Sequence, residues 1–245
     1  MEHFAPPDAL FYNRNTNNQD GVFTMDPISD NHELIDVIAR RRRYLGLDGF
    51  DKRVLQAMRN VDRLDFTPLG AQGVYEDEPV QIGYGQTCSQ PSMVAAMATL
   101  LELRAGLRVL EIGTGCGYSA CVTAQLIEPG GRLFSVELVP ELSTMARRNL
   151  KKTLPALRNY TLINADGSTG LPEQAPFDRI YLTAGVGKYF TRGHFVDQLA
   201  SQGILLYPEA YGDMYFVRKT PDGVSAHTMQ GVGFVPLRGT KGGFD

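Results

Sequence analysis

The chain has 245 residues, a net charge of −3 at pH 7, 43% apolar residues and 21% charged residues. These values are typical of one globular domain that buries a core, and they exclude a disordered or collagen-like chain. Acids and bases are mixed along the sequence, which favours neither a nucleic-acid nor a membrane partner. The chain has three cysteines but no C-x-x-C pair, which suits a reducing compartment. It shows no signal peptide and no long apolar run, so we expect a cytoplasmic protein.

The beginning of the chain differs in composition from the rest. Residues 1–30 mix prolines, asparagines and isolated aromatic residues, and we expect an N-terminal arm. Apolar residues then recur at helical spacing after Asp30 and Asn31, which predicts a capped helix. The arginines from Arg40 to Arg43 suit either a nucleic-acid contact or, more simply, cations that stabilise the helix C-terminus through its dipole.

Two more segments precede the expected core. Residues 50–58 have an amphipathic pattern that predicts a second helix. A polar run from Gln86 to Gln90 follows two glycines and precedes Pro91, a residue favoured in the first turn of a helix. Small donors at a helix N-terminus can hold an anion, and the same residues also suit an ordinary capped turn.

The core is organised around residues 107–137, which read LRVLEIGTGCGYSACVTAQLIEPGGRLFSVE. Residues 108–112 predict a buried parallel strand, the following glycines a tight turn, residues 118–126 a helix, and residues 133–136 a second strand that ends in Glu137. This order is typical of the nucleotide-binding half of a doubly wound α/β sheet, which binds its ligand at the carboxyl ends of the strands.

The glycine spacing distinguishes two kinds of nucleotide. A dinucleotide motif G-x-G-x-x-G beginning at Gly113 needs glycine at position 118, where the chain has Tyr118. The observed G-x-G-x-G, preceded by Glu111, resembles motif I of the class I S-adenosylmethionine (AdoMet) methyltransferases. In that family an acid at the position of Glu137 binds both ribose hydroxyls, and a carboxylate offers two acceptor oxygens for them. A glycine turn of another α/β protein is the alternative from this stretch alone.

Several further motifs resemble the protein-L-isoaspartate O-methyltransferase family. Residues 85–91, GQTCSQP, are similar to its G-Q-T-I-S-Q-P signature, which also precedes motif I. More matches follow in the family's order over about residues 31–239: Asn60-Val61-Asp62-Arg63 with Phe66 and Pro68, Asp166-Gly167-Ser168 with Pro172-Glu173 and residues 175–178, Gln198-Leu199 with Gly203 and Pro208, and Phe234-Val235-Pro236-Leu237.

The resemblance implies a fold and a domain organisation. We expect a doubly wound Rossmann-like sheet, mostly parallel, with a C-terminal antiparallel hairpin between residues 203–207 and 214–218. One methyltransferase domain would span residues 31–245. Residues 31–100 would form a helical cap and the substrate loop, and residues 101–245 the Rossmann-like core with the C-terminal strands.

The resemblance also implies the cofactor AdoMet, with S-adenosyl-L-homocysteine as product, and the roles of individual residues. Ser89, the expected catalytic residue, and Thr87 would orient the acceptor carboxylate and the methionine end of the cofactor. The other cofactor-binding residues would be Gln86 and Leu138, together with Glu111, Gly113, Thr114, Gly115 and Gly117 at the methionine portion, Glu137 at the ribose, and Asp166 and Gly167 at the adenine. Phe234, Val235 and Pro236 would line the substrate. A turn cap is the alternative for Asp166, and a terminal core strand for residues 234–237.

Methyl transfer to a carboxylate needs no general base, because the carboxylate is ionised at neutral pH and the protein must chiefly position the reactants. The four histidines have no ligand spacing, so neither a metal site nor a catalytic triad is predicted. The resemblance implies methylation of the free α-carboxylate of L-isoaspartyl residues in damaged proteins and peptides. We expect a monomer, although no sequence pattern specifies the oligomeric state.

Two other functions stay open. Cys88, Ser92, Ala165 and Glu209 depart from the family pattern, which motivates a specialised carboxyl methyltransferase for a dedicated peptide or small acid. The second alternative is a non-catalytic AdoMet-binding protein.

Overall fold

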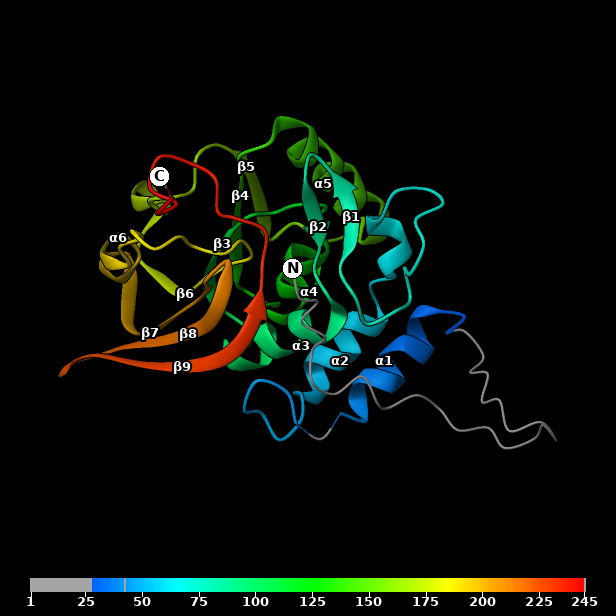
Figure 1. Ribbon diagram of the computed structural model, residues 1–245, viewed down its shortest axis with the longest axis horizontal. Helices are drawn as coiled ribbons and strands as arrows, with labels where there is room; N and C mark the ends of the chain where they lie inside the picture. The colour runs from blue at the N-terminus through cyan, green and yellow to red at the C-terminus, as the bar shows by residue number, and fades with distance from the viewer. Residues whose placement is uncertain (1–27, 42, 245) are drawn as a thin grey trace, which may run out of the picture.

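The computed structural model describes residues 28–41 and 43–244 (Figure 1). All but the last three residues of the expected N-terminal arm lie outside this part of the chain. In chain order the elements are α1 (Asn31–Ala39), α2 (Lys52–Arg59), the 3-10 helix η1 (Arg63–Phe66), β1 (Val80–Gly83), β2 (Gln86–Cys88), α3 (Pro91–Leu100), β3 (Arg108–Ile112), α4 (Tyr118–Leu126), β4 (Arg132–Glu137), α5 (Pro140–Thr153), β5 (Tyr160–Asn164), the 3-10 helix η2 (Pro172–Gln174), β6 (Phe177–Leu182), α6 (Gly193–Asp197), β7 (Leu199–Pro208), β8 (Tyr211–Thr220) and β9 (Gly223–Gly233).

Seven strands form one sheet in the order β5-β4-β3-β6-β7-β8-β9. β3 pairs in parallel with β4 and β6, whereas β7 pairs with β8 in an antiparallel hairpin that includes Leu205 opposite Val217. The predicted fold class and hairpin are confirmed. β9 adds an edge strand and ends at Gly233, so residues 234–237 lie beyond the sheet strands.

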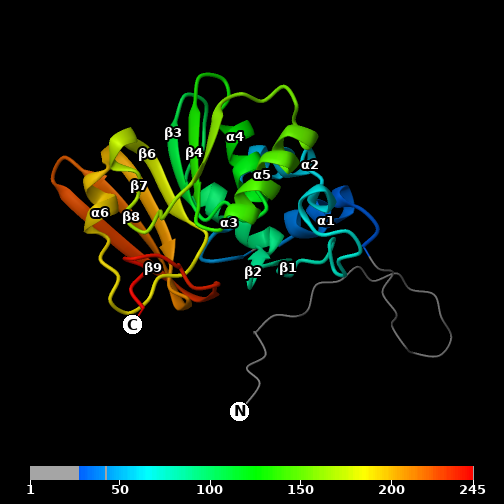
Figure 2. The ribbon, with the colours of Figure 1, turned by 90° about the horizontal axis from the view of Figure 1, so that it is seen from above.

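Alternate residues of the strands enter two cores, one on each face of the sheet. Val109 of β3 packs with residues of α1 to α5, whereas Leu110 and Ile112 pack with Phe195 of α6. Figure 2 shows the large group of helices on one side of the sheet and α6 on the other. The apolar character of β3 on both faces follows from this burial.

The first two helices begin where side chains cap them. Asp30 accepts from the main-chain N–H of Glu33, and Asp51 accepts from the N–H of Arg53. The helix predicted after Asp30 is confirmed, and the second begins two residues later than the sequence pattern suggests. An aspartate at this position satisfies an N–H that has no partner within the helix.

The segment before α3 is a two-stranded hairpin, where the sequence pattern predicts only a polar loop. β1 pairs with β2, and Tyr84 and Gly85 at the turn have φ angles of 56° and 69°. Two successive positive φ angles are the geometry of a tight hairpin turn. The strands have only four and three residues, which is too short for an alternating pattern to be recognised.

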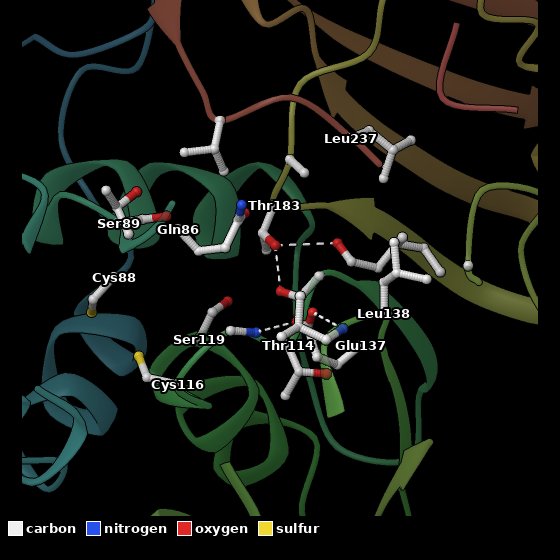
Figure 3. A pocket seen from close by; sticks show the side chains of 18 of the residues that line it. Gln86, Cys88, Ser89, Thr114, Cys116, Ser119, Glu137, Leu138, Thr183 and Leu237 are labelled. Atoms are coloured by element: carbon white, nitrogen blue, oxygen red, sulfur yellow. Dashed lines mark hydrogen bonds between the residues drawn. The ribbon is translucent and has the colours of Figure 1, made fainter. Parts of the chain in front are cut away.

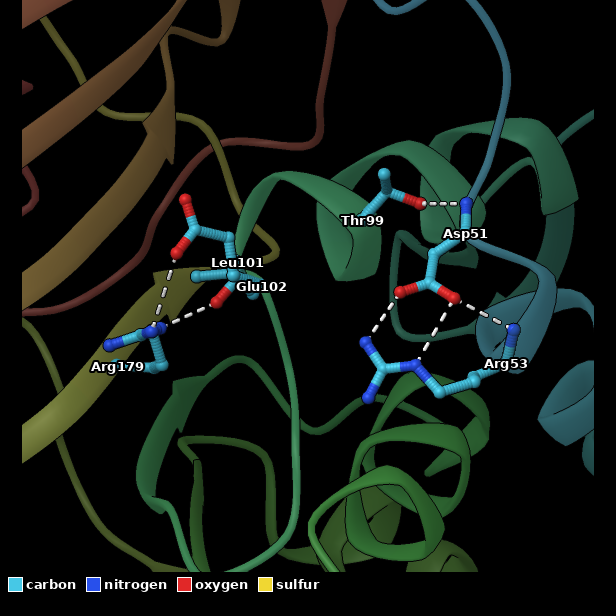
Figure 4. A network of polar contacts seen from close by, with 6 residues as sticks. All are labelled: Asp51, Arg53, Thr99, Leu101, Glu102 and Arg179. Carbon is cyan, nitrogen blue, oxygen red and sulfur yellow. Dashed lines mark hydrogen bonds and ion pairs between the residues drawn. The ribbon is translucent and has the colours of Figure 1, made fainter.

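Polar contacts fix the C-terminal end of α3, the helix that follows this hairpin (Figure 4). The buried Arg179 of β6 donates from Nε to the carbonyl oxygen of Leu101, which ends the helix. Thr99 Oγ1 accepts from the N–H of Asp51, 3.1 Å away, at the start of α2. The C-terminal end of α3 is therefore bound both to the sheet, through Arg179, and to the start of α2, through Asp51.

In the part of the chain that the structure describes, no helix is long and apolar enough to cross a membrane. No cluster of three or more histidine, cysteine or acidic side chains suited to a metal ion occurs among residues 28–41 and 43–244.

Candidate cofactor and substrate site

A pocket of about 780 Å³, including its open mouth, lies at the carboxyl ends of β3, β4 and β6. Figure 3 shows Gln86 and Ser89 on one side of the cavity and Glu137 with Leu138 on another. The predicted site residues that line it are Gln86, Thr87, Ser89, Gly113, Thr114, Gly115, Glu137, Leu138, Gly167, Val235 and Pro236.

The turn after β3 can approach neighbouring segments only because it is made of glycines. Gly113 has a φ of 95°, and a Cβ there would lie 2.4 Å from Oγ1 of Thr183. Gly117 has a φ of 91°, and a Cβ there would lie 2.4 Å from Leu150 of α5. Gly117 therefore faces α5 and serves the packing of the turn, whereas Gly113 lines the pocket.

Glu137 ends β4 with a buried carboxylate that holds the glycine turn. Its Oε2 accepts from the N–H of Gly115 at 2.8 Å, and its Oε1 accepts from the N–H of Val139 at 2.9 Å. Each carboxylate oxygen has a second lone pair, so the group can still accept from two hydroxyls of a ligand in the pocket. The geometry suits a cis-diol.

The loop that carries Ser89 rests on a buried cation. Arg63 is 0% exposed, and its two terminal nitrogens donate to main-chain oxygens, including those of Val74 and Glu78 at 2.7 Å each and Ser89 at 3.2 Å. The remaining acceptors of this guanidinium are the carbonyl oxygens of Gly73, Glu76 and Cys88. A buried charge is tolerated when oriented hydrogen bonds replace its hydration.

Asp77, in the segment before β1, joins the start of α3 to the residues that follow α1. Its carboxylate accepts from the N–H of Ser92 at 2.7 Å and from Ser92 Oγ at 2.6 Å, and it pairs with Arg41 at 2.5 Å. Of the four arginines after α1, Arg41 thus has a structural partner. The helix itself ends at Ala39, before these arginines.

Three other predicted site residues lie outside the lining. Glu111 is fully buried beneath the pocket, where it accepts from Ser135 and from Tyr181. Asp166 accepts from the N–H of Ser168 and from the N–H of Thr240, each at 2.8 Å, which is the turn-cap arrangement.

Phe234 is the third predicted site residue outside the pocket lining, because it packs in the hydrophobic core on the helix-covered face of the sheet. The N–H of Phe234 donates to Ala210, and the carbonyl of Val235 accepts from Gly185. Both main-chain groups serve the fold, whereas Val235 and Pro236 also line the pocket.

Several lining residues were not among the predicted site residues, among them Cys116, Ser119 and Thr183. Thr183 directly follows β6, the neighbour of β3, and its Oγ1 donates to the carbonyl oxygens of Ile112 and Gly113. The rule that ligands bind at the carboxyl ends of adjacent strands could have identified Thr183. Cys116 and Ser119 lie in the glycine turn and the first turn of α4, beside residues that the glycine motif identified.

The family model for protein-L-isoaspartate(D-aspartate) O-methyltransferase (PCMT) matches residues 30–242. The chain belongs to this family. A protein-L-isoaspartate O-methyltransferase of Methanococcoides burtonii is 42% identical over 204 residues, which cover 82% of this chain and 98% of the relative. Another, of Methanothrix thermoacetophila, is 44% identical over 194 residues, covering 78% and 90% of the two chains.

A solved structure with the same fold comes from Plasmodium falciparum, a protein described as a beta-aspartate methyltransferase (PCMT) in complex with S-adenosyl-L-homocysteine. It aligns with a TM-score of 0.73 and 25% identity, covering 86% of this chain and 99% of that one. The relationship to the PCMT family therefore extends over nearly the whole described chain.

Three of the four departures from the PCMT motifs are not among the residues that line the pocket. Glu209 accepts from Tyr215 Oη at 3.0 Å in the β7–β8 turn, Ser92 is bound to Asp77, and the N–H of Ala165 donates to the carbonyl of Glu137. Of the four departures, only Cys88 is among the lining residues.

Glu111 provides a pH-dependent prediction. Burial raises the pKa of Glu111 to about 7, although hydrogen bonds from Ser135 and Tyr181 act in the opposite direction. This pKa is above the value of about 4.3 in the unfolded chain, so between these two values the folded protein binds a proton that the unfolded chain has released. The stability that protonated Glu111 contributes is therefore fully present below a pH of about 4.3 and is lost as the pH rises through about 7. We expect Glu111→Gln to gain about 3 kcal/mol relative to the natural protein between pH 5 and 8.

Urea unfolding at several pH values measures this difference. The exposed Glu141 of α5 offers the control, since Glu141→Gln should keep a nearly constant difference over the same range. A constant difference for Glu111→Gln as well would contradict a raised pKa.

Proposed function

We infer that this protein is an AdoMet-dependent carboxyl O-methyltransferase that methylates the free α-carboxylate of L-isoaspartyl residues in damaged proteins and peptides. Membership of the PCMT family and relatives of this name at over 40% identity support this function. The structural observation that carries it is one pocket lined by both Glu137, a diol acceptor, and Ser89, a hydroxyl donor.

The lining residues fit the proposed cofactor. Glu137 would accept from the ribose hydroxyls, and the turn from Gly113 to Gly115 would lie against the methionine portion. The apolar side chains of Ile112, Leu138 and Leu237 would enclose the adenine. When bound, AdoMet supplies a methyl group on a positively charged sulfur.

The residues of the chain would then position the acceptor. We propose that Ser89 Oγ donates to the acceptor carboxylate and that Thr87 helps to hold it, while Val235 and Pro236 form the opposite wall. Arg63 adds a positive charge beneath the same loop, which attracts an anionic substrate. No proton has to be moved, so orientation and exclusion of water are the main contributions of the protein.

Paired peptides that differ only in an L-isoaspartyl or a normal aspartyl linkage test this function. With labelled AdoMet, we expect label only in the isoaspartyl peptide. Ser89→Ala should lower kcat/KM by roughly 10- to 150-fold, the equivalent of one hydrogen bond to a charged group, and still bind S-adenosyl-L-homocysteine in calorimetry.

The exposed Ser225 of β9 supplies the matched control, because Ser225→Ala should keep full activity. Labelling of neither peptide by the natural protein would overturn the repair function. Binding of the cofactor without turnover on any acid would instead support a non-catalytic protein.

We further propose that the protein acts as a monomer in the cytoplasm and binds no nucleic acid. The three cysteines are free and buried, as suits a reducing compartment, and Arg41 is occupied by Asp77. Light scattering on the purified protein and a titration with nucleic acid at low salt test these points.

A further inference from the structure

Two thiols line the pocket on segments that are distant in the sequence. Cys88 ends β2, next to Ser89, and Cys116 lies in the glycine turn after β3. Each residue is 3% exposed, and neither forms a disulfide. Figure 3 shows their sulfur atoms directed toward each other at the edge of the cavity.

The two thiols differ in acidity. A hydrogen bond from Cys116 and the nearby charge of Arg63 outweigh burial and lower the pKa of Cys88 to about 7. The same contact with Cys88, followed by burial, raises the pKa of Cys116. This arrangement pairs a thiol of lowered pKa, which favours the nucleophilic thiolate, with a thiol of raised pKa, which favours the protonated form.

We propose that Cys88 and Cys116 form a redox modification site in the wall of the pocket, which peroxides convert to a disulfide. The Cys88 sulfur attacks one oxygen of hydrogen peroxide, the O–O bond breaks, and the released hydroxide leaves as water after taking up a proton. The Cys116 sulfur then attacks the resulting sulfenic acid, so the S–S bond forms, the S–O bond breaks and a second water leaves. Two thiols are oxidised and one peroxide is reduced.

The position of the pair makes oxidation consequential. Side chains hold the main chain at both cysteines. Asn149 Nδ2 donates to the carbonyl oxygen of Cys116 at 3.0 Å, and Arg63 donates to the carbonyl oxygens of Cys88 and Ser89. Bonded sulfurs lie about 2 Å apart, closer than two thiols in van der Waals contact, so disulfide formation displaces the Ser89 loop relative to the glycine turn. A shift of about 1 Å in a reacting group can cost roughly 100-fold in rate.

The third cysteine is an internal control. Cys121 lies in α4, is 0% exposed and is not among the lining residues. Burial raises its pKa to about 12, so it stays a thiol at neutral pH and reacts slowly with peroxide.

The experiment treats the full-length protein with hydrogen peroxide, with and without saturating S-adenosyl-L-homocysteine. We expect a mass loss of two hydrogens, a Cys88–Cys116 cross-linked peptide after digestion, and an unmodified Cys121. Methyl transfer should fall about 100-fold and return with dithiothreitol. The ligand should slow oxidation because it covers both thiols.

Variants separate this site from general oxidative damage. After peroxide treatment, Cys88→Ser and Cys116→Ser should each keep more than half of the activity that the same variant has before treatment. Cys121→Ser should be inactivated by peroxide like the natural protein. A link through Cys121, oxidation of Cys88 without a cross-link, or a cross-linked protein with full activity would overturn the proposal. The activity readout rests on the proposed function, whereas the mass and thiol readouts do not depend on the substrate, so a failure of the proposed function and a failure of the redox site are distinguishable.

Discussion

Replacement of Arg63 by methionine is expected to lower the free energy of unfolding by about 3–5 kcal/mol. Methionine fills much of the same volume but donates no hydrogen bond. The carbonyl oxygens of Val74, Glu78 and Ser89 would lose their donor; the bond to Val74 is buried and the other two are partly buried. An unsatisfied buried acceptor costs about 1–3 kcal/mol. Urea unfolding followed by circular dichroism measures the loss.

An exposed arginine on the same part of the chain is the control. The side chain of Arg43 is 85% exposed and pairs with Asp48, so Arg43→Met should change stability by less than about 0.5 kcal/mol. If Arg63→Met were destabilised by less than 1 kcal/mol, the buried cation would not be what holds the Ser89 loop.

Replacement of Glu137 by glutamine is expected to weaken binding of S-adenosyl-L-homocysteine by at least about 100-fold, or roughly 3 kcal/mol. The substitution keeps the shape but turns one acceptor into a donor. The new NH₂ group would face the N–H of Gly115 or of Val139, and one ribose hydroxyl would lose its acceptor. Calorimetry measures the affinity directly.

An analogue that lacks one ribose hydroxyl makes this test specific. The analogue should bind the natural protein much more weakly than the parent compound, but the difference should shrink in Glu137→Gln, because the partner is already lost. Glu141→Gln, an exposed change on α5, should leave affinity within twofold. An undiminished difference in Glu137→Gln would show that the ribose binds elsewhere.

The sequence pattern identified the pocket through strand ends, whereas the contacts of individual side chains depend on segments that are distant in the chain. Glu111 lies in an apolar run and was expected at the cofactor. Side chains alternate along β3, so Glu111 points to the helix-covered face of the sheet, beneath the pocket. Asp166 follows a strand as a ligand-binding acid would, but its partner is Thr240, 74 residues away. A residue type and a strand end do not specify which neighbour takes the carboxylate.

By itself the sequence determined the elements whose signals are local: the glycine turn between β3 and α4, the cap of α1 and the apolar pattern of the first two helices. These depend on φ angles, on hydrogen bonds between near neighbours and on apolar periodicity, which adjacent residues encode. Only the tertiary structure decided that Arg63 supports Ser89 and that Cys88 meets Cys116. Such contacts join segments that the packed sheet brings together, and no local pattern specifies the geometry of that packing.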